Sequence, residues 1–376
     1  MTIATLGGFM SALAPRAGCY GRKRPPSRAR TLSKAARLLK YAMAFAFLVC
    51  LLSDSYAQLR PFPEKSGFSG YVNLGAGALR GKSNVIAGTR FGASISKETI
   101  PSIDAKPDAE TTGVPLVNFE LNYTFATKRT QMFLGNLLED FLRFDFATQL
   151  GVRHQFRDKS IFAASLLSTS IPAEVWADPY VENQKRDETD RTSNGIRLIF
   201  GRIAGTGLQL EYTQRKIEID DELSGLTQLG LSAQQAALLD REGDLQRLRV
   251  TYYFKLNERN SIAPALWFTN EDLDGGAMAN DLIEIYFTHL YNGKRFNFVT
   301  NVAFGTADYD KVNPIYGRKR DDDRTVLSFT VFDKKLFGEN AKWWGSLTVA
   351  AFSEDANIDF YDQDMAVFGL SAFRLF

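Results

Sequence analysis

Two residue types are scarce in this sequence, and their scarcity excludes several classes of protein. The 376 residues include only two histidines, His154 and His289, and two cysteines, Cys19 and Cys50. Neither histidine has a serine or aspartate partner at a spacing that indicates a catalytic group, and no G-x-S-x-G nucleophile motif is present. Acid–base and nucleophilic catalysis in proteins usually need such groups. We therefore predict no catalytic residue and no enzyme activity, and we assign both histidines to the lipid–water interface.

Long hydrophobic runs are also missing, because mean hydropathy is −0.19 and only Tyr41–Leu52 is apolar throughout. This run is too short to cross a bilayer as a helix and has the length of a signal-peptide core. Basic residues precede it, and the small residues Ser55 and Ala57 follow it. We predict Sec-dependent export with cleavage after Ala57, so that residues 1–57 are a signal peptide and 58–66 a short periplasmic N-terminus.

Removal of residues 1–57 changes the chemistry of the chain. Both cysteines are lost, so the mature protein has no disulfide in an oxidising compartment. Nine basic residues and one acidic residue leave with the leader, so totals of 45 and 43 become 36 and 42, a net charge of −6. The basic balance of the whole chain comes from the leader alone. We predict no nucleic-acid partner, no cofactor and no metal centre.

Alternation of apolar and polar residues with a period of two dominates the mature chain. In 117–125 the residues V, F, L, Y and F alternate with N, E, N and T. Segments 142–153 and 247–256 repeat the pattern, with strong charges on the polar face. This pattern is typical of β-strands that are apolar on one face and polar on the other.

About fourteen segments have this pattern, and most are long enough to cross a bilayer at a tilt. We predict an all-β fold over residues 67–376, a transmembrane antiparallel up-and-down β-barrel with both termini in the periplasm. The predicted strands are 67–79, 115–126, 129–135, 140–154, 159–171, 193–203, 206–219, 244–257, 259–270, 281–292, 295–306, 324–335, 341–354 and 365–376.

The connections between these strands alternate in length. Every second connection is a tight polar turn, such as "RDKS" or "NGKR". The other connections are mostly long, at 80–114, 172–192, 220–243, 271–280, 307–323 and 355–364. Short periplasmic turns and long extracellular loops are the layout of an outer-membrane barrel. A soluble β-sandwich also alternates in hydrophobicity, but it has no reason to alternate loop length.

The chain ends inside the pattern, on Phe376, with no polar tail. We predict that the last strand closes the barrel and that Phe376 is the signal read by the barrel-assembly machinery. Arg374 interrupts the apolar face of this strand, where its head can reach water near the membrane surface. We assign Trp343 and Trp344 to the periplasmic aromatic girdle and Trp267 to the outer girdle.

The polar faces of the predicted strands supply candidates for a mixed-charge lumen. Charges on an inner wall need water or mutual salt bridges, because isolated charges in a dry lumen are costly. A barrel of fourteen strands is too wide to be filled by its own wall side chains. The candidate lining residues are Glu120, Arg143, Asp145, Arg153, Glu211, Arg215, Arg247, Arg249 and Lys255.

Several of the long loops have features of their own. Loop 80–114 is long enough to fold inward as a plug, and 172–192 is long enough to fold inward as a constriction. In 220–243, Ser232 and Gln235 are spaced as a capping box for a short helix, which is either a lid over the mouth or a surface ornament. The acidic stretches 271–274 and 354–364 are candidates for binding divalent cations, but the first lacks the twelve-residue calcium pattern. We interpret their charge as solvated or as cation bridging to lipopolysaccharide.

Four stretches of the mature chain resemble a family of outer-membrane proteins of Gram-negative bacteria that is known only as a domain of unknown function. The stretches are "GFSGYVNLGAGALRGKSNVIAG", "FLGNLLEDFLRFDFATQLGVR", "IPAEVWADPY" and "DYDKVNPIYG". The resemblance covers residues 66–376. It implies the fold and the location, and it brings no substrate or catalytic residue.

Two functions are compatible with these observations. The first is a passive channel or substrate-selective uptake porin of the Gram-negative outer membrane, gated by its extracellular loops. The second is a structural or adhesive barrel with a closed lumen and ligand-binding loops. The expected partners are outer-membrane lipid and lipopolysaccharide, the barrel-assembly machinery and a small solute.

Overall fold

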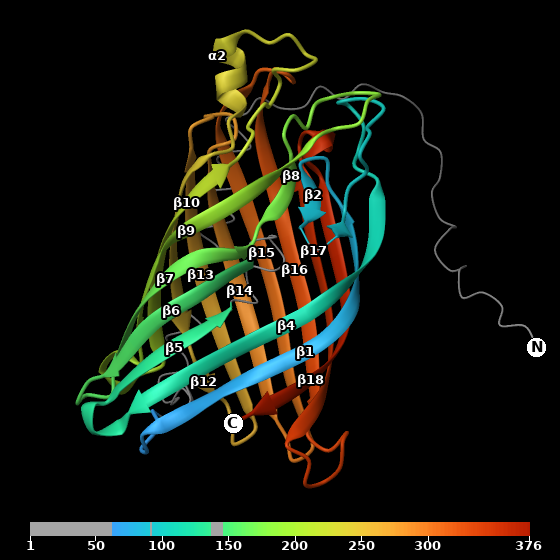
Figure 1. Ribbon diagram of the computed structural model, residues 1–376. Helices are drawn as coiled ribbons and strands as arrows, with labels where there is room; N and C mark the ends of the chain where they lie inside the picture. Colours follow the sequence, from blue (N-terminus) through green and yellow to red (C-terminus); the bar gives the residue numbers. More distant parts are fainter. Residues whose placement is uncertain (1–61, 91, 137–145) are drawn as a thin grey trace, which may run out of the picture. The chain divides into compact units, whose positions relative to one another are not determined.

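The wall of the molecule is an antiparallel sheet that closes on itself. The computed structural model describes residues 62–90, 92–136 and 146–376, all within the compact unit Leu52–Phe376. The last strand, β18, pairs with the first, β1, from Tyr71↔Leu375 to Lys82↔Asp364. Figure 1 shows β1 (blue) beside β18 (red) on the closed wall. The predicted antiparallel barrel is therefore confirmed.

Fourteen strands form this wall in the described part of the chain, as the sequence predicts, with β11 and β12 as two pieces of one strand interrupted at Tyr253. Residues 140–145 of the predicted fourth strand lie outside the described residues. The wall strands are β1 Gly67–Lys82, β4 Ala109–Phe125, β5 Thr130–Asn136, β6 Phe146–Gln155, β7 Ile161–Ile171, β9 Glu188–Gly201, β10 Leu208–Ile219, β11 Gly243–Tyr252 with β12 Phe254–Lys255, β13 Asn260–Leu273, β14 Asn280–Asn292, β15 Phe296–Asn313, β16 Arg318–Asp333, β17 Trp343–Ala356 and β18 Gln363–Leu375.

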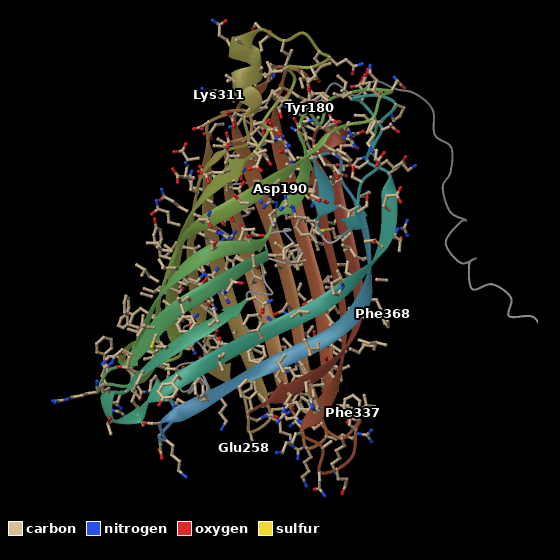
Figure 2. The ribbon with its side chains drawn as sticks, in the orientation of Figure 1. Tyr180, Asp190, Glu258, Lys311, Phe337 and Phe368 are labelled. Atoms are coloured by element: carbon tan, nitrogen blue, oxygen red, sulfur yellow. The ribbon has the colours of Figure 1, made fainter. Side chains whose placement is uncertain are left out.

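Successive residues of each wall strand face opposite sides of the wall. Leu150 is 53 % exposed whereas its neighbour Gln149 is 8 % exposed, and Leu248 is 44 % exposed whereas Arg247 is 6 % exposed. Figure 2 shows Phe368 projecting from the outside of the wall. An apolar outer face with polar residues inside is stable in lipid and unfavourable in water. The alternation of the sequence thus assigns these faces correctly.

The end of the barrel that carries the short connections is called the turn end here. Glu258 and Phe337 mark it in Figure 2. In the turn 156–160, Lys159 has a left-handed backbone (φ 71°), and the Asp158 carboxylate accepts hydrogen bonds from the Ser160 amide (3.0 Å) and hydroxyl (2.8 Å). These bonds lower the pKa of Asp158. The polar residues of the turn therefore satisfy its backbone locally.

At the opposite end, called the loop end, some wall strands extend farther than the sequence predicts. β15 continues to Asn313 and β16 begins at Arg318, so most of the predicted loop 307–323 is a long hairpin. Its pairing persists to Asn313↔Arg318 across one irregularity. Beyond the bilayer both faces of a strand can be polar, so the hydrophobic alternation disappears while the backbone ladder continues. The prediction of a long loop at 307–323 was wrong for this reason.

β5 is short, and the side chain of its last residue continues the ladder. Asn136 Oδ1 accepts a hydrogen bond from the Phe119 amide (2.8 Å), and Asn136 Nδ2 donates to the Val117 carbonyl (2.8 Å). The side-chain amide therefore does for β4 what one more residue of β5 would do. Farther along β4 lies Pro115, an exposed residue without an amide hydrogen, which suits a strand edge.

Three further strands belong to the connections at the loop end: β2 Ile86–Thr89, β3 Ala93–Ser94 and β8 Ala173–Trp176. β8 follows β7 and pairs with β9, while β2 pairs with β8 on its other edge and with β3. We call residues 83–90, 92–96 and 173–176 the plug. The two loops predicted to be long enough to fold inward, 80–114 and 172–192, supply it.

Helical structure is limited to short segments in the described residues. They are η1 Ala126–Lys128, η3 Ile203–Gly205, α2 Ala233–Ala236, η4 Ala237–Leu239 and η5 Asp359–Tyr361. Among these residues we find no helix with the length and apolarity needed to span a membrane.

Candidate solute path and its plug

The plug packs against the inner face of the wall through apolar side chains. Ile95 is fully buried, and it lies so close to β1 that a Cβ atom at Gly81 would be 2.6 Å from the Cβ of Ile95. Only glycine permits this approach without a shift. Ile95 and Ala93 belong to a buried cluster with wall residues such as Phe352 and Met365. The plug is therefore seated in the lumen by close packing.

A buried arginine joins the two loops that form the plug. Arg186 is 1 % exposed, and its Nη1 donates to the carbonyl of Asn84 at 2.8 Å. Its Nη2 donates to the Ser96 hydroxyl (3.2 Å) and to the Lys97 carbonyl, and its guanidinium lies over the Trp176 ring (4.2 Å). Burial lowers the pKa of Arg186 to about 10, so the group remains charged at neutral pH. Arg186 thus links loop 172–192 to loop 80–114.

Above the plug, the loops share an apolar cluster that we call the cap. The Tyr180 and Tyr361 hydroxyls are 2.7 Å apart, and Asn313 Nδ2 donates to the Tyr361 hydroxyl at 2.7 Å. Burial raises the pKa of both tyrosines, so both stay protonated and able to donate. The fully or nearly fully buried members of the cap are Ile100, Tyr180, Leu239, Ala277, Met278, Ala356, Ile358, Phe360 and Tyr361.

The predicted short helix is present in the loop between β10 and β11. Ser232 and Gln235 form the predicted capping box around α2, with the Ser232 amide 3.1 Å from Gln235 Oε1. Leu239, just after α2, is fully buried in the cap. Farther along, Arg241 pairs with Glu222 at 2.7 Å. Of the two interpretations left open by the sequence, the structure favours the lid, because this loop is part of the cap.

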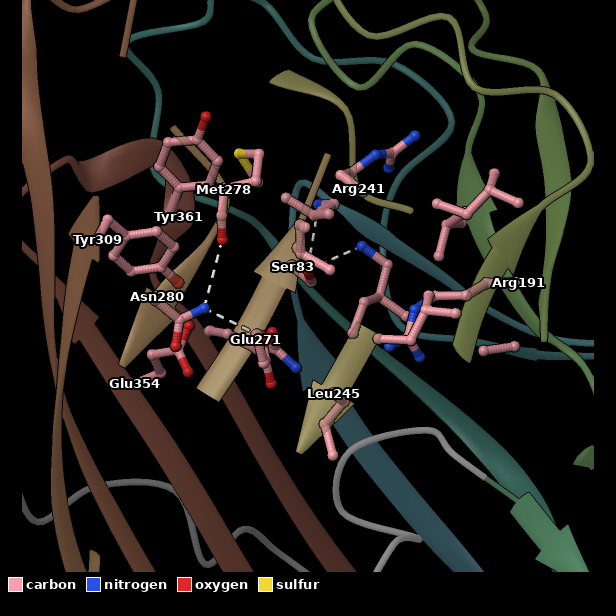
Figure 3. Close-up of a pocket in the computed structure, with 18 of the residues that line it drawn as sticks. Ser83, Arg191, Arg241, Leu245, Glu271, Met278, Asn280, Tyr309, Glu354 and Tyr361 are labelled. Carbon is pink, nitrogen blue, oxygen red and sulfur yellow. Dashed lines mark hydrogen bonds between the residues drawn. The ribbon is translucent and has the colours of Figure 1, made fainter. Parts of the chain in front are cut away.

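A cavity of about 200 Å³ lies between the plug, the cap and the wall; we call it the outer cavity. Figure 3 shows Arg191 and Leu245 on one side of it and Tyr309 and Glu354 on the other. The plug contributes apolar lining residues, among them Val175. Each water fills about 30 Å³ of liquid, so the outer cavity has room for roughly six waters or one small solute.

The charges of β16 and β17 that line the outer cavity are paired. Arg320 binds Asp322 through two bonds, from Nε to Oδ1 (2.9 Å) and from Nη2 to Oδ2 (2.7 Å). The same Nη2 lies 2.7 Å from Glu354, and the guanidinium lies 4.2 Å from the centre of the Tyr361 ring. Tyr309 donates to Asp322 at 3.0 Å. This network connects the wall to the cap.

A second cavity, of about 590 Å³, lies in the part of the lumen nearer the turn end; we call it the inner cavity. It is lined by Glu120 and Arg153, whose nearest charged atoms are 3.4 Å apart. The Arg153 guanidinium lies over the Phe133 ring at 4.2 Å. Phe376 also contributes to the lining. This region is therefore polar and roomy.

Five arginines lie on the lumen face of β9, β10 and β11; we call them the arginine wall. Among the described residues of these three strands, Glu211 is the one carboxylate at a lumen-facing position, 3.4 Å from Arg197 and 3.8 Å from Arg249. Arg197 lines the inner cavity, whereas Arg215 lines the outer one. The arginine wall consists of Arg191, Arg197, Arg215, Arg247 and Arg249.

Trp267 lies inside the barrel, and its assignment to the outer aromatic girdle was wrong. It is 5 % exposed and stacks on Tyr286 with ring centres 4.0 Å apart. The guanidinium groups of Arg249 (4.7 Å) and Arg247 (5.4 Å) lie over its ring. The period-two alternation makes the next residue, Phe268, the lipid-facing one. The prediction relied on the position of Trp267 near a strand end and did not use the alternation of faces along the strand.

The predicted lining residues fall into several places. Glu120 and Arg153 line the inner cavity, and Arg215 and Arg247 line the outer one. Lys255 lies at the turn end, where its Nζ is 2.9 Å from Glu258. That a solute path runs along these residues stays a prediction. Glu211 and Arg249 lie on the lumen face of the wall, with their nearest charged atoms 3.8 Å apart. Arg143 and Asp145 lie outside the described residues.

Sequence reasoning missed several charged residues of this region. Arg320 and Arg324 were assigned to a loop or its edge, so their lumen-facing parity was not considered. The sequence gives no signal for Arg186, because most of its acceptors are backbone carbonyls, two of them in a loop about 90 to 100 residues away. Arg191 and Arg197 could have been found from the alternation in β9, where 191, 193, 195 and 197 share a face.

The histidines and the acidic loops have ordinary polar partners. His154 Nδ1 is 3.0 Å from the Thr130 hydroxyl, and His289 Nε2 is 2.9 Å from Asn260 Oδ1, all on the outside of the wall. Asp362 pairs with Lys106 at 2.8 Å. Within the described segments, no group of three His, Cys, Asp or Glu side chains is arranged to hold a metal ion.

A closed fourteen-strand wall with an apolar exterior and a charged interior defines a transmembrane β-barrel of the outer-membrane type. The family model "Protein of unknown function (DUF2860)" matches residues 67–371, and the chain belongs to this family. The resemblance found in the sequence is therefore confirmed. A search of curated proteins gives no match.

Solved outer-membrane barrels are similar in fold. A Pseudomonas aeruginosa FadL homologue is 10 % identical, over 82 % of this chain and 90 % of its own, with a TM-score of 0.40. The P. putida toluene transporter TodX is 11 % identical, over 82 % and 90 %, with a TM-score of 0.41. OpdK of P. aeruginosa, solved with vanillate, is 12 % identical, over 84 % and 100 %, with a TM-score of 0.34.

Proposed function

We propose that this protein is an uptake channel of the Gram-negative outer membrane whose loops gate it. The observation that carries the proposal is the division of the lumen: cavities of about 200 and 590 Å³ lie in a wide barrel whose outer part holds a plug made of its own loops. Side-chain packing and hydrogen bonds hold this plug, and such contacts can open and re-form. We place the turn end in the periplasm and the loop end outside the cell.

Export and assembly are part of the same proposal. Sec-dependent export with cleavage after Ala57 delivers the chain, and the barrel-assembly machinery recognises the strand that ends at Phe376. Outer-membrane lipid contacts the apolar exterior, and lipopolysaccharide contacts the charged loop end. We propose transport without catalysis, since both histidines bond to neutral side chains on the outside of the wall.

Removal of the plug tests the channel directly. Lys82 and Ala109 are cross-strand partners, so a two-residue Asn-Gly turn can join them in place of residues 83–108. We expect the intact protein to conduct little in planar bilayers and the shortened variant to show large, steady conductance. The control variant loses residues 336–340 from the turn between β16 and β17 and should behave as the intact protein does.

The capped mouth favours a second candidate, a barrel with a closed lumen whose loops bind a partner. Loop residues such as Phe360 and Leu239 are fully buried in the cap, which is unusual for loops that serve only as connections. A shortened variant that folds, as judged by a heat-modifiable gel shift, but carries no current would support this second function and contradict the channel.

A further inference from the structure

We propose that the inner cavity binds an uncharged, hydroxyl-rich solute of the size of one or two sugar rings. This inference rests on the proposed function, because it names the class of solute for the same lumen. It starts from four residues with side-chain amides that line the inner cavity, and each of them is at most 9 % exposed. They are Asn122, Gln131, Gln149 and Gln209.

The four amides come from four different strands, and the cross-strand register places them in successive rows of the lumen face. Gln209 of β10 lies in the row nearest the turn end, and Gln131 of β5 lies in the next row. Asn122 of β4 and Gln149 of β6 follow in the third and fourth rows. Neighbouring rows are two residues apart along each strand, which is about 7 Å. A solute that moves along this face therefore meets an amide in every row.

Two of the amides are held by neighbouring side chains. Asn122 Nδ2 donates to Glu120 Oε1 (3.0 Å), and Gln131 Nε2 donates to the Thr124 hydroxyl (2.8 Å). These bonds restrict both side chains, so a solute that binds beside them does not have to order them first.

The other two amides have no protein partner in the described part of the chain. No hydrogen bond joins the side-chain amide of Gln149 or Gln209 to another described residue, and both residues line the inner cavity. An amide donates through its nitrogen and accepts through its oxygen, and a hydroxyl group can also do both. Hydroxyl groups of a solute can therefore bond to either end of these two amides.

The charged residues that line the inner cavity are paired. The nearest charged atoms of Glu120 and Arg153 are 3.4 Å apart, and Arg197 Nε lies 3.4 Å from Glu211. A charged solute would lose its hydration and would have to displace one of these pairs. An uncharged solute leaves the pairs intact. The electrostatics of the cavity therefore favour a solute without charge.

Apolar side chains lie between the polar ones and complete the match to a sugar. Ile161, Ala163 and Ile199 contribute to the lining. A sugar ring carries C–H surface beside its hydroxyl groups, and this surface gains from apolar contact. A hydrocarbon would fit the apolar part but would leave the amides without partners, which is costly. The volume of about 590 Å³ lies within the range of roughly 300–1,000 Å³ typical of small-molecule sites.

Four related probes separate hydroxyl groups from charge and shape: glucose, tetrahydropyran-2-methanol, glucuronate and glucosamine. Tetrahydropyran-2-methanol keeps the ring but lacks the ring hydroxyls of glucose. Saturation-transfer NMR with the full-length folded barrel in detergent should show glucose binding at least about tenfold more tightly than this analogue. The two charged derivatives should bind more weakly than glucose. Equal affinity for glucose and tetrahydropyran-2-methanol, or tighter binding of a charged derivative, would overturn the assigned class.

Substitutions assign the effect to the amides. The double variant Gln149→Met with Gln209→Met keeps side chains of similar length and removes their hydrogen bonding. It should lose about tenfold in glucose affinity and leave the affinity for tetrahydropyran-2-methanol unchanged. Gln234→Met removes an exposed amide from α2 and should change neither affinity. Undiminished glucose binding by the double variant, with its fold shown by a heat-modifiable gel shift, would contradict the proposal.

Ion currents separate this inference from the channel itself. In the variant lacking residues 83–108, added glucose should reduce the current, and Gln149→Met with Gln209→Met should raise the half-blocking concentration about tenfold. A conducting barrel whose current glucose does not change refutes this inference and leaves the channel intact. A folded barrel that binds glucose but never conducts refutes the channel and leaves the ligand class intact.

Discussion

The Tyr180 hydroxyl lies 2.7 Å from the Tyr361 hydroxyl, although 181 residues separate the two tyrosines in the chain. Their side chains belong to different loops, and Tyr180 stacks on Phe360, the neighbour of Tyr361 (ring centres 5.2 Å apart). The loops at this end of the barrel are therefore joined through side chains and not only through the wall strands beneath them. The cap is one packed structure.

Tyr361→Phe should loosen the cap. It removes the hydrogen bonds to Tyr180 and Asn313 and leaves buried polar groups without partners, at a cost of about 1–3 kcal/mol. Hydrogen exchange of the loop amides measures this as faster exchange at the loop end with unchanged exchange in the wall. Tyr212→Phe, whose hydroxyl bonds Gln246 at 3.4 Å on the exposed surface, is the matched control. Equal exchange in all three proteins would show that the tyrosine pair does not stabilise the cap.

Arg186→Gln should release the plug while the barrel stays folded. A buried guanidinium makes hydrogen bonds worth more than neutral ones, and the loss of those to loop 80–114 should cost about 2–3 kcal/mol. Limited proteolysis should then cut loop 80–114 sooner, whereas the heat-modifiable gel shift remains. Its neighbour Lys185 forms an exposed ion pair with Glu98, so Lys185→Gln should leave the cleavage rate unchanged. Protection of the loop in both variants would contradict the role given to Arg186.

Adjacent residues of β11 test the assignment of its faces. Leu248 faces outward and Arg247 inward, so Leu248→Arg puts a charge into lipid. The expected cost is roughly 2–4 kcal/mol at the bilayer midplane. Quantitative folding into vesicles of defined lipid measures it, with Arg247→Leu as the inward counterpart that should change folding far less. A loss of folding confined to Arg247→Leu would reverse the faces of β11.

The sequence predicts the wall well because the bilayer imposes a period of two on every spanning strand. Leu150, Leu248 and Phe368 could be placed outside, and Gln149 and Arg247 inside, from alternation alone. Beyond the bilayer that constraint ends, which is why the extensions of β15 and β16 were missed.

From the sequence, the plug could be predicted only in so far as two loops are long enough to fold inward. The segment "IAGT" of β2 is too short to show a pattern, and its partner β8 lies 84 or more residues away in the chain. Most hydrogen bonds of Arg186 go to backbone carbonyls, which every residue has, so the residue types of the loops do not predict them. The candidate site could therefore be predicted from the sequence less completely than the fold.

Cleavage after Ala57 predicts that the protein in the membrane begins at Gln58, a residue that can cyclise. Intact-mass measurement of protein extracted from outer membranes should give the mass of residues 58–376, or that mass less one ammonia. Ala57→Leu, which replaces the small residue required at the cleavage site, should retain the leader. Recovery of the membrane form with residues 1–57 attached would show that this segment is not a cleaved signal.

Deletion of Phe376 should reduce assembly sharply without changing synthesis. Phe376 forms the last backbone pair of the seam, the junction where β18 pairs with β1. The Gly70 amide donates to the Phe376 carbonyl (2.9 Å), and the Phe376 amide donates to the Gly70 carbonyl (3.1 Å). The deletion therefore removes two hydrogen bonds from the seam as well as the aromatic side chain.

Phe376→Ala separates these effects, since it keeps both backbone bonds. We expect both variants to be exported and processed, but to give less heat-modifiable barrel in the outer membrane than the intact protein. If Phe376→Ala assembles normally and the deletion does not, the seam alone requires this residue. Normal surface levels of both variants would refute the assembly signal.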